Sequence, residues 1–179
     1  MSLCAAVAGA RENRCMISYD PNFRRSLWES EQLAKTQIEW GLCQADIVKI
    51  SDEEIDFLWG LSPERGAERI RNEYGASLVY ATLGPNGCYF SNAADDGYVA
   101  APRGVHVVDT TGAGDIFGGS AMSRLLKMGK APSELNGAEL REIVCFACCA
   151  ASLSTQSRGG LTSIVEESRV RECMETCCW

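Results

Sequence analysis

The stretch VVDTTGAGDIFGG, residues 107 to 119, joins a β-branched segment to a glycine-rich turn and then to the start of a helix. We predict a strand over 106–110, a tight turn after it, and a helix over about 115–129. Such a turn directs free backbone N–H groups and the positive end of a helix dipole at one place, where proteins commonly hold anions. An acidic residue there, Asp115, either caps the helix or acts on the partner of a bound phosphate.

Two anion-binding interpretations of this turn compete with plain capping. Residues 112–118 read G-x-G-x-x-x-G, one residue longer than the dinucleotide fingerprint, and no acidic residue ends a second strand about 20 positions later. Asp115 would also repel a pyrophosphate. In the second interpretation Asp115 is a general base for phosphoryl transfer, and the amides of Gly112, Ala113 and Gly114 hold the phosphoryl group.

The composition is typical of a globular protein with one substantial core. The chain has 179 residues, of which 46% are hydrophobic and 23% are charged. Its formal net charge of -7 argues against nucleic-acid and anionic-membrane partners, because such partners need clustered Lys and Arg. No apolar run approaches the roughly 18 to 20 residues that span a bilayer, and no basic leader is present. We therefore expect a cytoplasmic protein that acts on small molecules.

Ten cysteines raise the question of a disulfide framework or a metal site. Because no signal peptide is recognisable, we predict reduced thiols. Six of the cysteines form two groups, near residues 145–149 and 173–178, and each group has helical spacing among Ala, Val and Met. Cysteine in such a pattern behaves as a small buried hydrophobe, and we favour this interpretation over metal binding. The groups that a metal would need are Cys145, Cys148 and Cys149 together with Cys173, Cys177 and Cys178.

Strand and helix patterns alternate along the chain. Strands are predicted at CMISYDPN, ADIVKIS and SLVYATLG, and a hairpin at PNGCYFSN and GYVAAP. Helical patterns separate the first strands, and beyond residue 115 the chain is predicted to be helical. This order predicts an α/β fold with a mainly parallel sheet, in which ligands gather at the carboxyl ends of the strands. The polar segments that follow predicted strands are Asp20 to Asn22, Ser51 to Glu54, Thr82 to Gly87 and Asp109 to Asp115.

The stretch at 107–119 closely resembles the C-terminal signature of the PfkB, or ribokinase-like, carbohydrate kinases, whose D-T-x-G-A-G-D carries a catalytic base and an anion hole. ISYDPNFRRSLW and ADIVKISDEEIDFLWG resemble the fructokinase and 2-keto-3-deoxygluconate kinase branches. TLGPNGCYF resembles the family's nucleotide-side T-x-G-x-x-G, and FACCAASLSTQSRGG the helix and turn beside the adenine. The resemblance implies a three-layer ribokinase-like fold and a single, partial kinase domain over residues 1–179.

The resemblance also assigns roles to positions of this chain. One departure is Ser51, which stands where the family's N-x-x-E motif commonly has Asn. The implied roles are Asp115 as base with Gly112, Ala113 and Gly114 as anion hole; Asn22 and Arg24 for substrate; Thr82, Gly84 and Gly87 for the nucleotide; Asp109 and Thr111 for a monovalent cation such as K⁺; and Glu54 for Mg²⁺ through water.

The implied reaction is phosphoryl transfer from ATP to a sugar hydroxyl, with ATP and Mg²⁺ as cofactors and fructose as the first candidate sugar. The alternatives are a 2-keto-3-deoxygluconate kinase or another PfkB sugar kinase, and a non-catalytic nucleotide-binding fragment.

The chain resembles only the nucleotide-side half of the family. Complete members carry, before the D-P-N strand, the other half of the sheet, a β-lid and a sugar-binding segment. Whether the chain is active alone stays open, because positioning contributes much of the acceleration in phosphoryl transfer. A truncated sheet would also expose an unpaired edge, which predicts self-association.

Overall fold

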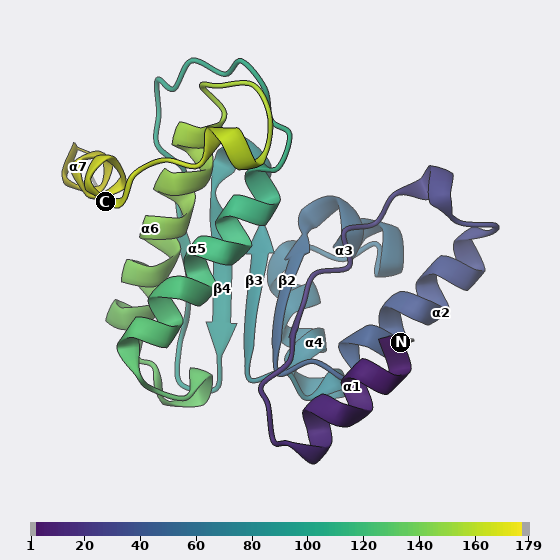
Figure 1. Ribbon diagram of the computed structural model, residues 1–179. Helices are drawn as coiled ribbons and strands as arrows, with labels where there is room; N and C mark the ends of the chain where they lie inside the picture. Colours follow the sequence, from purple (N-terminus) through teal and green to yellow (C-terminus); the bar gives the residue numbers. More distant parts are fainter. Residues whose placement is uncertain (1–2, 177–179) are drawn as a thin grey trace. The chain divides into compact units, whose positions relative to one another are not determined.

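The computed structural model describes residues 3–176. Helices and strands alternate up to about residue 82, and after two further strands the rest of the described chain is helices and loops (Figure 1). The strands are β1 (Ser18–Tyr19), β2 (Ile47–Ser51), β3 (Leu78–Thr82), β4 (Cys88–Asn92) and β5 (Asp96–Val99). The α-helices are α1 (Leu3–Glu12), α2 (Glu31–Leu42), α3 (Asp52–Trp59), α4 (Pro63–Tyr74), α5 (Ala113–Met128), α6 (Gly137–Ser154) and α7 (Glu167–Thr176). Short 3-10 turns lie at Arg25–Leu27, Gly84–Asn86, Pro132–Glu134 and Leu161–Ser163.

The strands are neighbours in the sheet in chain order, from β1 to β5. β1 pairs with β2 in parallel, with Ser18 opposite Ile47 and Tyr19 opposite Val48. The described residues form two compact units: unit 1 comprises 3–81 and 91–93, and unit 2 comprises 82–90 and 94–176. The single domain predicted over residues 1–179 stays a prediction.

In unit 1 the helices begin at the signals that the sequence contains. The Ser30 hydroxyl accepts a hydrogen bond from the Leu33 amide at 3.1 Å and caps α2. Ser62 caps α4, which has Pro63 at its first position and ends at the left-handed Gly75. The buried apolar side chains of this unit include Ile38, Leu42, Ile47, Val48, Ile50, Ile55, Ile70, Leu78 and Val79.

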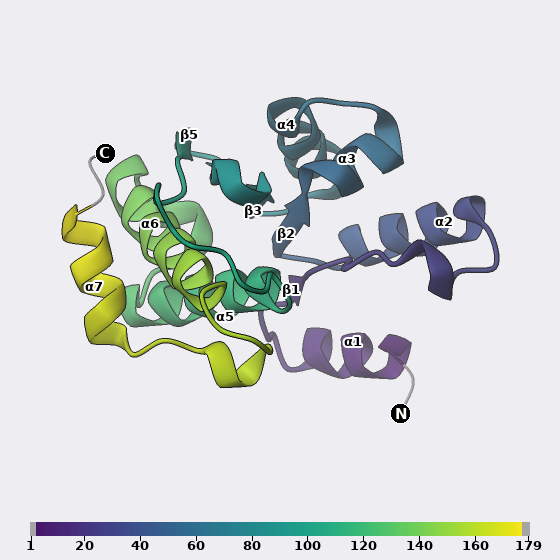
Figure 2. The same cartoon turned by 90° about the horizontal axis from the view of Figure 1, so that it is seen from above.

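In unit 2, α5 and α7 both lie beside α6 (Figures 1 and 2). The Asn136 side chain accepts hydrogen bonds from two amides in the first turn of α6 and fixes where this helix begins. On α6, Phe146, Cys149 and Ala150 are buried and cluster with Val170 of α7. The position of α7 is thus set by apolar burial against α6.

The cysteines of α6 are core residues. Cys145, Cys148 and Cys149 are buried, and Cys173 lies at the border of the cluster around Val170. In residues 3–176, no group of three His, Cys, Asp or Glu side chains could hold a metal ion. The burial of Cys145, Cys148 and Cys149 is what the interpretation as small buried hydrophobes predicts, and Cys177 and Cys178 lie outside the described residues.

The strand predicted over 106–110 is wrong. These residues belong to no strand of the described chain, and Val107 and Val108 are 55% and 48% exposed. The amides of Val108 and Asp109 donate instead to the Thr155 carbonyl just after α6, at 2.7 and 3.0 Å. A helix end satisfies this backbone, so the β-branched residues here form a loop.

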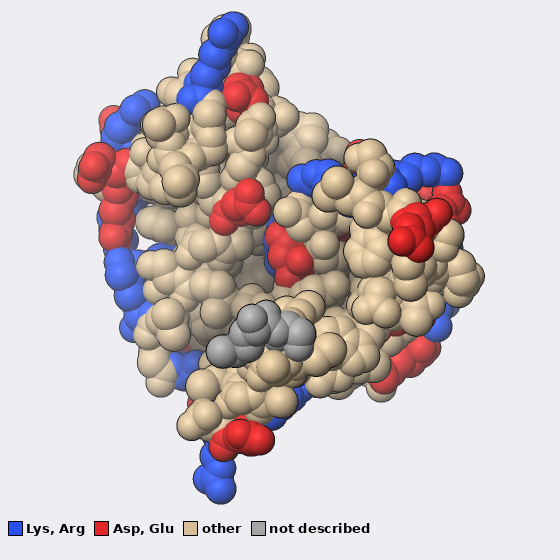
Figure 3. Space-filling model, turned by 45° about the vertical axis from the view of Figure 1, so that its right-hand side comes forward, with Lys and Arg blue, Asp and Glu red and all other residues tan. Residues whose placement is uncertain are grey.

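None of the helices within residues 3–176 is long and apolar enough to cross a membrane. On the face shown in Figure 3, Lys and Arg side chains are scattered among Asp and Glu side chains. The predicted lack of nucleic-acid and membrane partners stays a prediction.

Strand β1 is the last strand at one end of the sheet order, with β2 as its neighbour. Leu3 and Leu27 of the same unit are 65% and 80% exposed. We therefore still expect self-association, because an open edge and exposed apolar side chains favour pairing with a second chain. Sedimentation at increasing concentration should show species heavier than the 19.4 kDa monomer. A clean monomer that binds no apolar dye would contradict this expectation.

Gly66 allows α4 to approach α3 closely. A Cβ at this position would lie 2.4 Å from Cγ2 of Ile55, which is fully buried. Gly66→Ala should therefore lower the free energy of unfolding by about 1–3 kcal/mol through overpacking. The matched control is Gly119→Ala in α5, where no described atom lies within 4 Å of the added Cβ, and it should raise stability by about 0.5–1 kcal/mol. Urea unfolding of both variants tests the expected opposite signs.

Candidate active site

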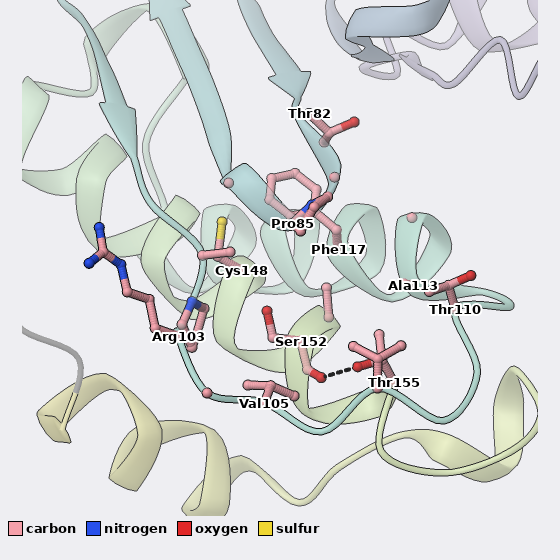
Figure 4. Close-up of a pocket in the computed structure, with 18 residues that line it drawn as sticks. Thr82, Pro85, Arg103, Val105, Thr110, Ala113, Phe117, Cys148, Ser152 and Thr155 are labelled. Atoms are coloured by element: carbon pink, nitrogen blue, oxygen red, sulfur yellow. Dashed lines mark hydrogen bonds between the residues drawn. The ribbon is translucent and has the colours of Figure 1, made fainter.

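A cavity of about 670 Å³ lies in unit 2, among the end of β3, the loop 101–107 and helices α5 and α6 (Figure 4). Its volume is in the range of small-molecule and cofactor sites. The structure brings predicted residues from two distant motifs to this one cavity. They are Thr82, Gly84 and Gly87 of the turn predicted to contact the nucleotide, called the nucleotide turn below, and Ala113 and Gly114 at the start of α5.

The nucleotide turn requires its glycines. Gly84 has φ +54° and Gly87 has φ +111°, and a Cβ on Gly87 would lie 2.0 Å from the Val99 carbonyl oxygen. The Leu83 amide donates to the Gly87 carbonyl at 2.8 Å and closes the turn. Only glycine fits at 87, because both the backbone conformation and the space exclude a side chain. At these two positions the turn therefore lines the cavity with backbone alone.

The glycine-rich turn before α5 is held against the turn that follows α6. Gly112 has φ +79°, and a Cβ there would lie 3.0 Å from Cα of Gly160. Asp109 bridges the two turns, since its Oδ1 accepts from the Thr111 amide at 2.9 Å and its Oδ2 from the Gly159 amide at 3.0 Å. Hydrogen bonds from Gly159 and then from Thr111 lower the pKa of Asp109 to about 2. The carboxylate is thus ionised at neutral pH.

The first turn of α5 offers amides to an anion, but one of them is already used. The Ala113 amide donates to the Thr110 carbonyl at 3.1 Å. The first hydrogen bond of the helix runs from the Ile116 amide to the Gly112 carbonyl, so the amides of Gly114 and Asp115 do not donate to a carbonyl of α5. Asp115 is exposed and follows Gly114, which lines the cavity. The anion-hole role of Gly112, Ala113 and Gly114 stays a prediction.

Asn22, Arg24 and Glu54 lie in unit 1. The Glu54 side chain reaches the turn that contains Asn22: its Oε1 accepts from the Phe23 amide at 2.7 Å. The exposed Arg24 guanidinium donates to the Phe23 carbonyl at 3.0 Å. Unit 1 therefore gathers the predicted substrate and magnesium positions around one turn.

The contacts of Glu54 do not fit the role that the resemblance implies. The residue is only 7% exposed, and its Oε2 accepts from both the Ser51 amide at 2.8 Å and the Ser51 hydroxyl at 3.0 Å. With the bond from Phe23, three of about four acceptor positions of the carboxylate are occupied within the chain. Little capacity is left for water bound to Mg²⁺.

Sequence reasoning missed one wall of the cavity and found another only by resemblance. The hairpin predicted at GYVAAP and the strand predicted over 106–110 cover only the two ends of the loop 101–107, although Pro102 and Gly104 in APRGV indicate a loop. The α6 wall includes Cys148 and Ser152, and it ends at Thr155, whose hydroxyl donates to the Ser152 carbonyl at 2.7 Å (Figure 4). Burial raises the pKa of Cys148 to about 12, so the thiol at this wall is neutral.

An α/β sheet with a glycine-rich turn and a helix start beside a cavity fits a ribokinase-like kinase, and solved structures of this class are similar to the chain. The chain is similar to a fructokinase double mutant from Vibrio cholerae O395, solved with fructose, ADP and a potassium ion: the TM-score is 0.84 and the identity 29%, over 96% of this chain and 54% of that one. It is also similar to aminoimidazole riboside kinase from Salmonella enterica, solved with aminoimidazole riboside and an ATP analogue, with TM-score 0.78 and 26% identity over 96% and 57% of the two chains. The predicted fold class is confirmed.

Residues 2–167 match the pfkB family carbohydrate kinases, and the chain belongs to this family. Fructokinase-1 of Zea mays is 38% identical over 169 residues, which cover 93% of this chain and 51% of that protein. The chain spans about half the length of the curated relatives that it matches. The predicted family is thereby confirmed.

The low pKa of Asp109 predicts how the bridge between the two turns responds to pH. A carboxylate whose pKa falls from 3.8 to about 2 on folding stabilises the folded state above pH 4, and this contribution disappears as the pH falls through about 2. Wild type should therefore be more stable than Asp109→Asn by a constant amount from pH 7 to pH 5, and the difference should shrink below pH 4. Urea unfolding across this range measures it. A difference that grows on acidification would contradict the bridge.

Proposed function

We propose that this chain carries the nucleotide side and the catalytic base of an ATP-dependent sugar kinase that transfers the γ-phosphoryl group of ATP to a hydroxyl of fructose. One observation carries the proposal: the turn of Thr82, Gly84 and Gly87 lines the same cavity as Gly114, next to the exposed Asp115. The fructokinase relatives support the choice of sugar.

In this proposal the adenine and ribose of ATP occupy the apolar part of the cavity, against Val105, Phe117 and the α6 wall. Aromatic and aliphatic side chains favour a planar base through contact area. The phosphates extend to the start of α5, where the first-turn amides and the helix dipole attract negative charge.

Asp115 is the proposed base. Its carboxylate takes the proton of the sugar hydroxyl as the hydroxyl oxygen forms a bond to the γ-phosphorus, and the bond between this phosphorus and the bridging oxygen breaks to release ADP. The neighbouring amides stabilise charge on the transferred group, because they are oriented before the reaction begins.

Two cations belong to the proposal. Asp109 is ionised and accepts hydrogen bonds from Gly159 and Thr111, and in this proposal its carboxylate also attracts a monovalent cation such as K⁺ beside Thr111. Mg²⁺, when bound with ATP, neutralises charge on the phosphates. Since Glu54 does not fit the implied contact to Mg²⁺, the proposal uses no step through Glu54.

The choice of sugar and the activity of the chain alone need separate tests. The similarity to a riboside kinase shows that this fold also occurs in a protein solved with another substrate, so 2-keto-3-deoxygluconate and other sugars are compared with fructose. Binding of ATP without turnover would favour the nucleotide-binding fragment. The cytoplasmic location stays a prediction.

Asp115→Asn tests the proposed base. Turnover of ATP with fructose and Mg²⁺ should fall about 10²–10⁴-fold, because a positioned base contributes this much. The affinity for ATP, measured by calorimetry, should change by less than about 3-fold, since the amides that hold the phosphates remain. Full turnover in the variant would exclude Asp115 as base.

The matched control is Asp52→Asn. Asp52 lies in the first turn of α3, as Asp115 does in α5, so both substitutions remove a negative charge near a helix N-terminus. The control should keep its turnover. An equal loss in both variants would mean that the effect comes from helix stability.

A further inference from the structure

Glu54 makes a contact that helix capping does not require. Within the capping box of α3, the Ser51 hydroxyl accepts from the Glu54 amide at 3.2 Å and the Glu54 carboxylate accepts from the Ser51 amide. Of the two carboxylate oxygens, the capping box uses only Oε2. The other oxygen, Oε1, accepts from the Phe23 amide, 31 residues away in the sequence, at 2.7 Å.

Nor is this carboxylate needed for the helix dipole. Asp52 and Glu53 lie in the same first turn of α3 and supply negative charge there. Burying a third carboxylate is costly unless hydrogen bonds compensate it. At 7% exposure Glu54 bears this cost, and the bonds from Phe23 and Ser51 offset it. The burial is explained if the carboxylate serves the turn at Phe23.

That turn has an unusual backbone conformation. Asn22 has φ +46°, in the left-handed region that Asn tolerates better than most other non-glycine residues. The Asn22 amide donates to Oδ1 of Asp20 at 3.1 Å, and Oδ2 of Asp20 accepts from the Lys49 ammonium at 2.8 Å. The turn is therefore held on one side through Asp20 by β2 and on the other through Glu54 by α3.

We propose that Glu54 is a positioning residue, whose carboxylate fixes the backbone of residues 20–24 and so the places of Asn22 and Arg24, instead of standing free for metal-bound water. The importance of those two places rests on the proposed function, in which both residues contact the substrate. A shift of about 1 Å in such a contact can cost a hundredfold in rate. The contact itself belongs to the chain without any ligand and can be measured so.

The Phe23 amide is the reporter. In wild type its hydrogen exchange should be slow, because the bond to Glu54 must break first. Glu54→Leu keeps the size of the side chain and removes both acceptor oxygens, so exchange at Phe23 should speed up roughly tenfold or more. Glu54→Gln keeps one acceptor oxygen and should give an intermediate rate. The amide of Ile70 in α4 is the reference and should keep its rate.

Two controls separate this role from helix capping and from charge. Ser51→Ala removes the capping hydroxyl and its bond to Oε2 of Glu54, but leaves the bond from Phe23 to Oε1, and Glu53→Gln removes an exposed carboxylate from the same turn. Neither should change exchange at Phe23. Faster exchange at Phe23 in Ser51→Ala as large as in Glu54→Leu, or an unchanged rate in Glu54→Leu, would overturn the proposal.

Magnesium gives an independent readout. Glu54→Leu should lower the midpoint of thermal unfolding by roughly 5 °C both in EDTA and in Mg²⁺, because the lost bonds do not involve a metal. The ratio of ADP affinities with and without Mg²⁺ should stay within about twofold of wild type. A ratio that collapses in Glu54→Leu alone would assign Glu54 to the metal and overturn the proposal. Failure of wild type to bind ADP would refute the proposed function, while exchange at Phe23 would still decide the role of Glu54.

Discussion

The candidate site depends on the contact between two turns in unit 2. The Asp109 carboxylate accepts one amide from its own turn and one from the turn after α6, and a Cβ on Gly112 would lie only 3.0 Å from Cα of Gly160. Because α5 begins at Ala113, this contact decides where its first-turn amides and Asp115 lie relative to α6. A single ionised side chain thus couples the helix that supplies the proposed base to the helix that walls the cavity.

The parts of the fold that could be predicted from the sequence are those that depend on contacts between residues close together in the chain. The starts of α4 and α6, with Ser62-Pro63 and Asn136, follow from capping chemistry within three or four positions. The loop at 106–110 could not be predicted this way, because its Val residues have the composition of a strand. Only the Thr155 carbonyl, nearly 50 residues later, shows that its backbone is satisfied by a helix end.

The same distinction applies to the candidate site. Gly84, Gly87 and Gly112 could be predicted from the sequence, because backbone conformations that exclude a side chain are occupied mainly by glycine. The partners of Glu54 could be predicted only in part. The S-x-x-E spacing indicates the bond to Ser51. The bond to Phe23 joins segments 31 residues apart, so no pattern of neighbouring residues predicts it. Resemblance assigned Glu54 to magnesium because a motif records residue types and leaves out what each oxygen contacts.

The candidate residues of unit 2 are mainly backbone groups and apolar side chains, whereas those of unit 1 are polar side chains. This difference bears on specificity for the substrate. The proposed nucleotide side in unit 2 consists of glycine turns, apolar walls and helix-end amides, groups that suit a phosphate and a planar base but do not distinguish one sugar from another. The turn in unit 1 instead presents two polar side chains, Asn22 and Arg24, from a backbone fixed by carboxylates. Side chains on a fixed backbone can change identity without disturbing the fold, whereas backbone amides cannot. Within this fold the nucleotide side is therefore expected to be the shared part of related kinases, and the turn at Asn22 one of the places where substrates are distinguished.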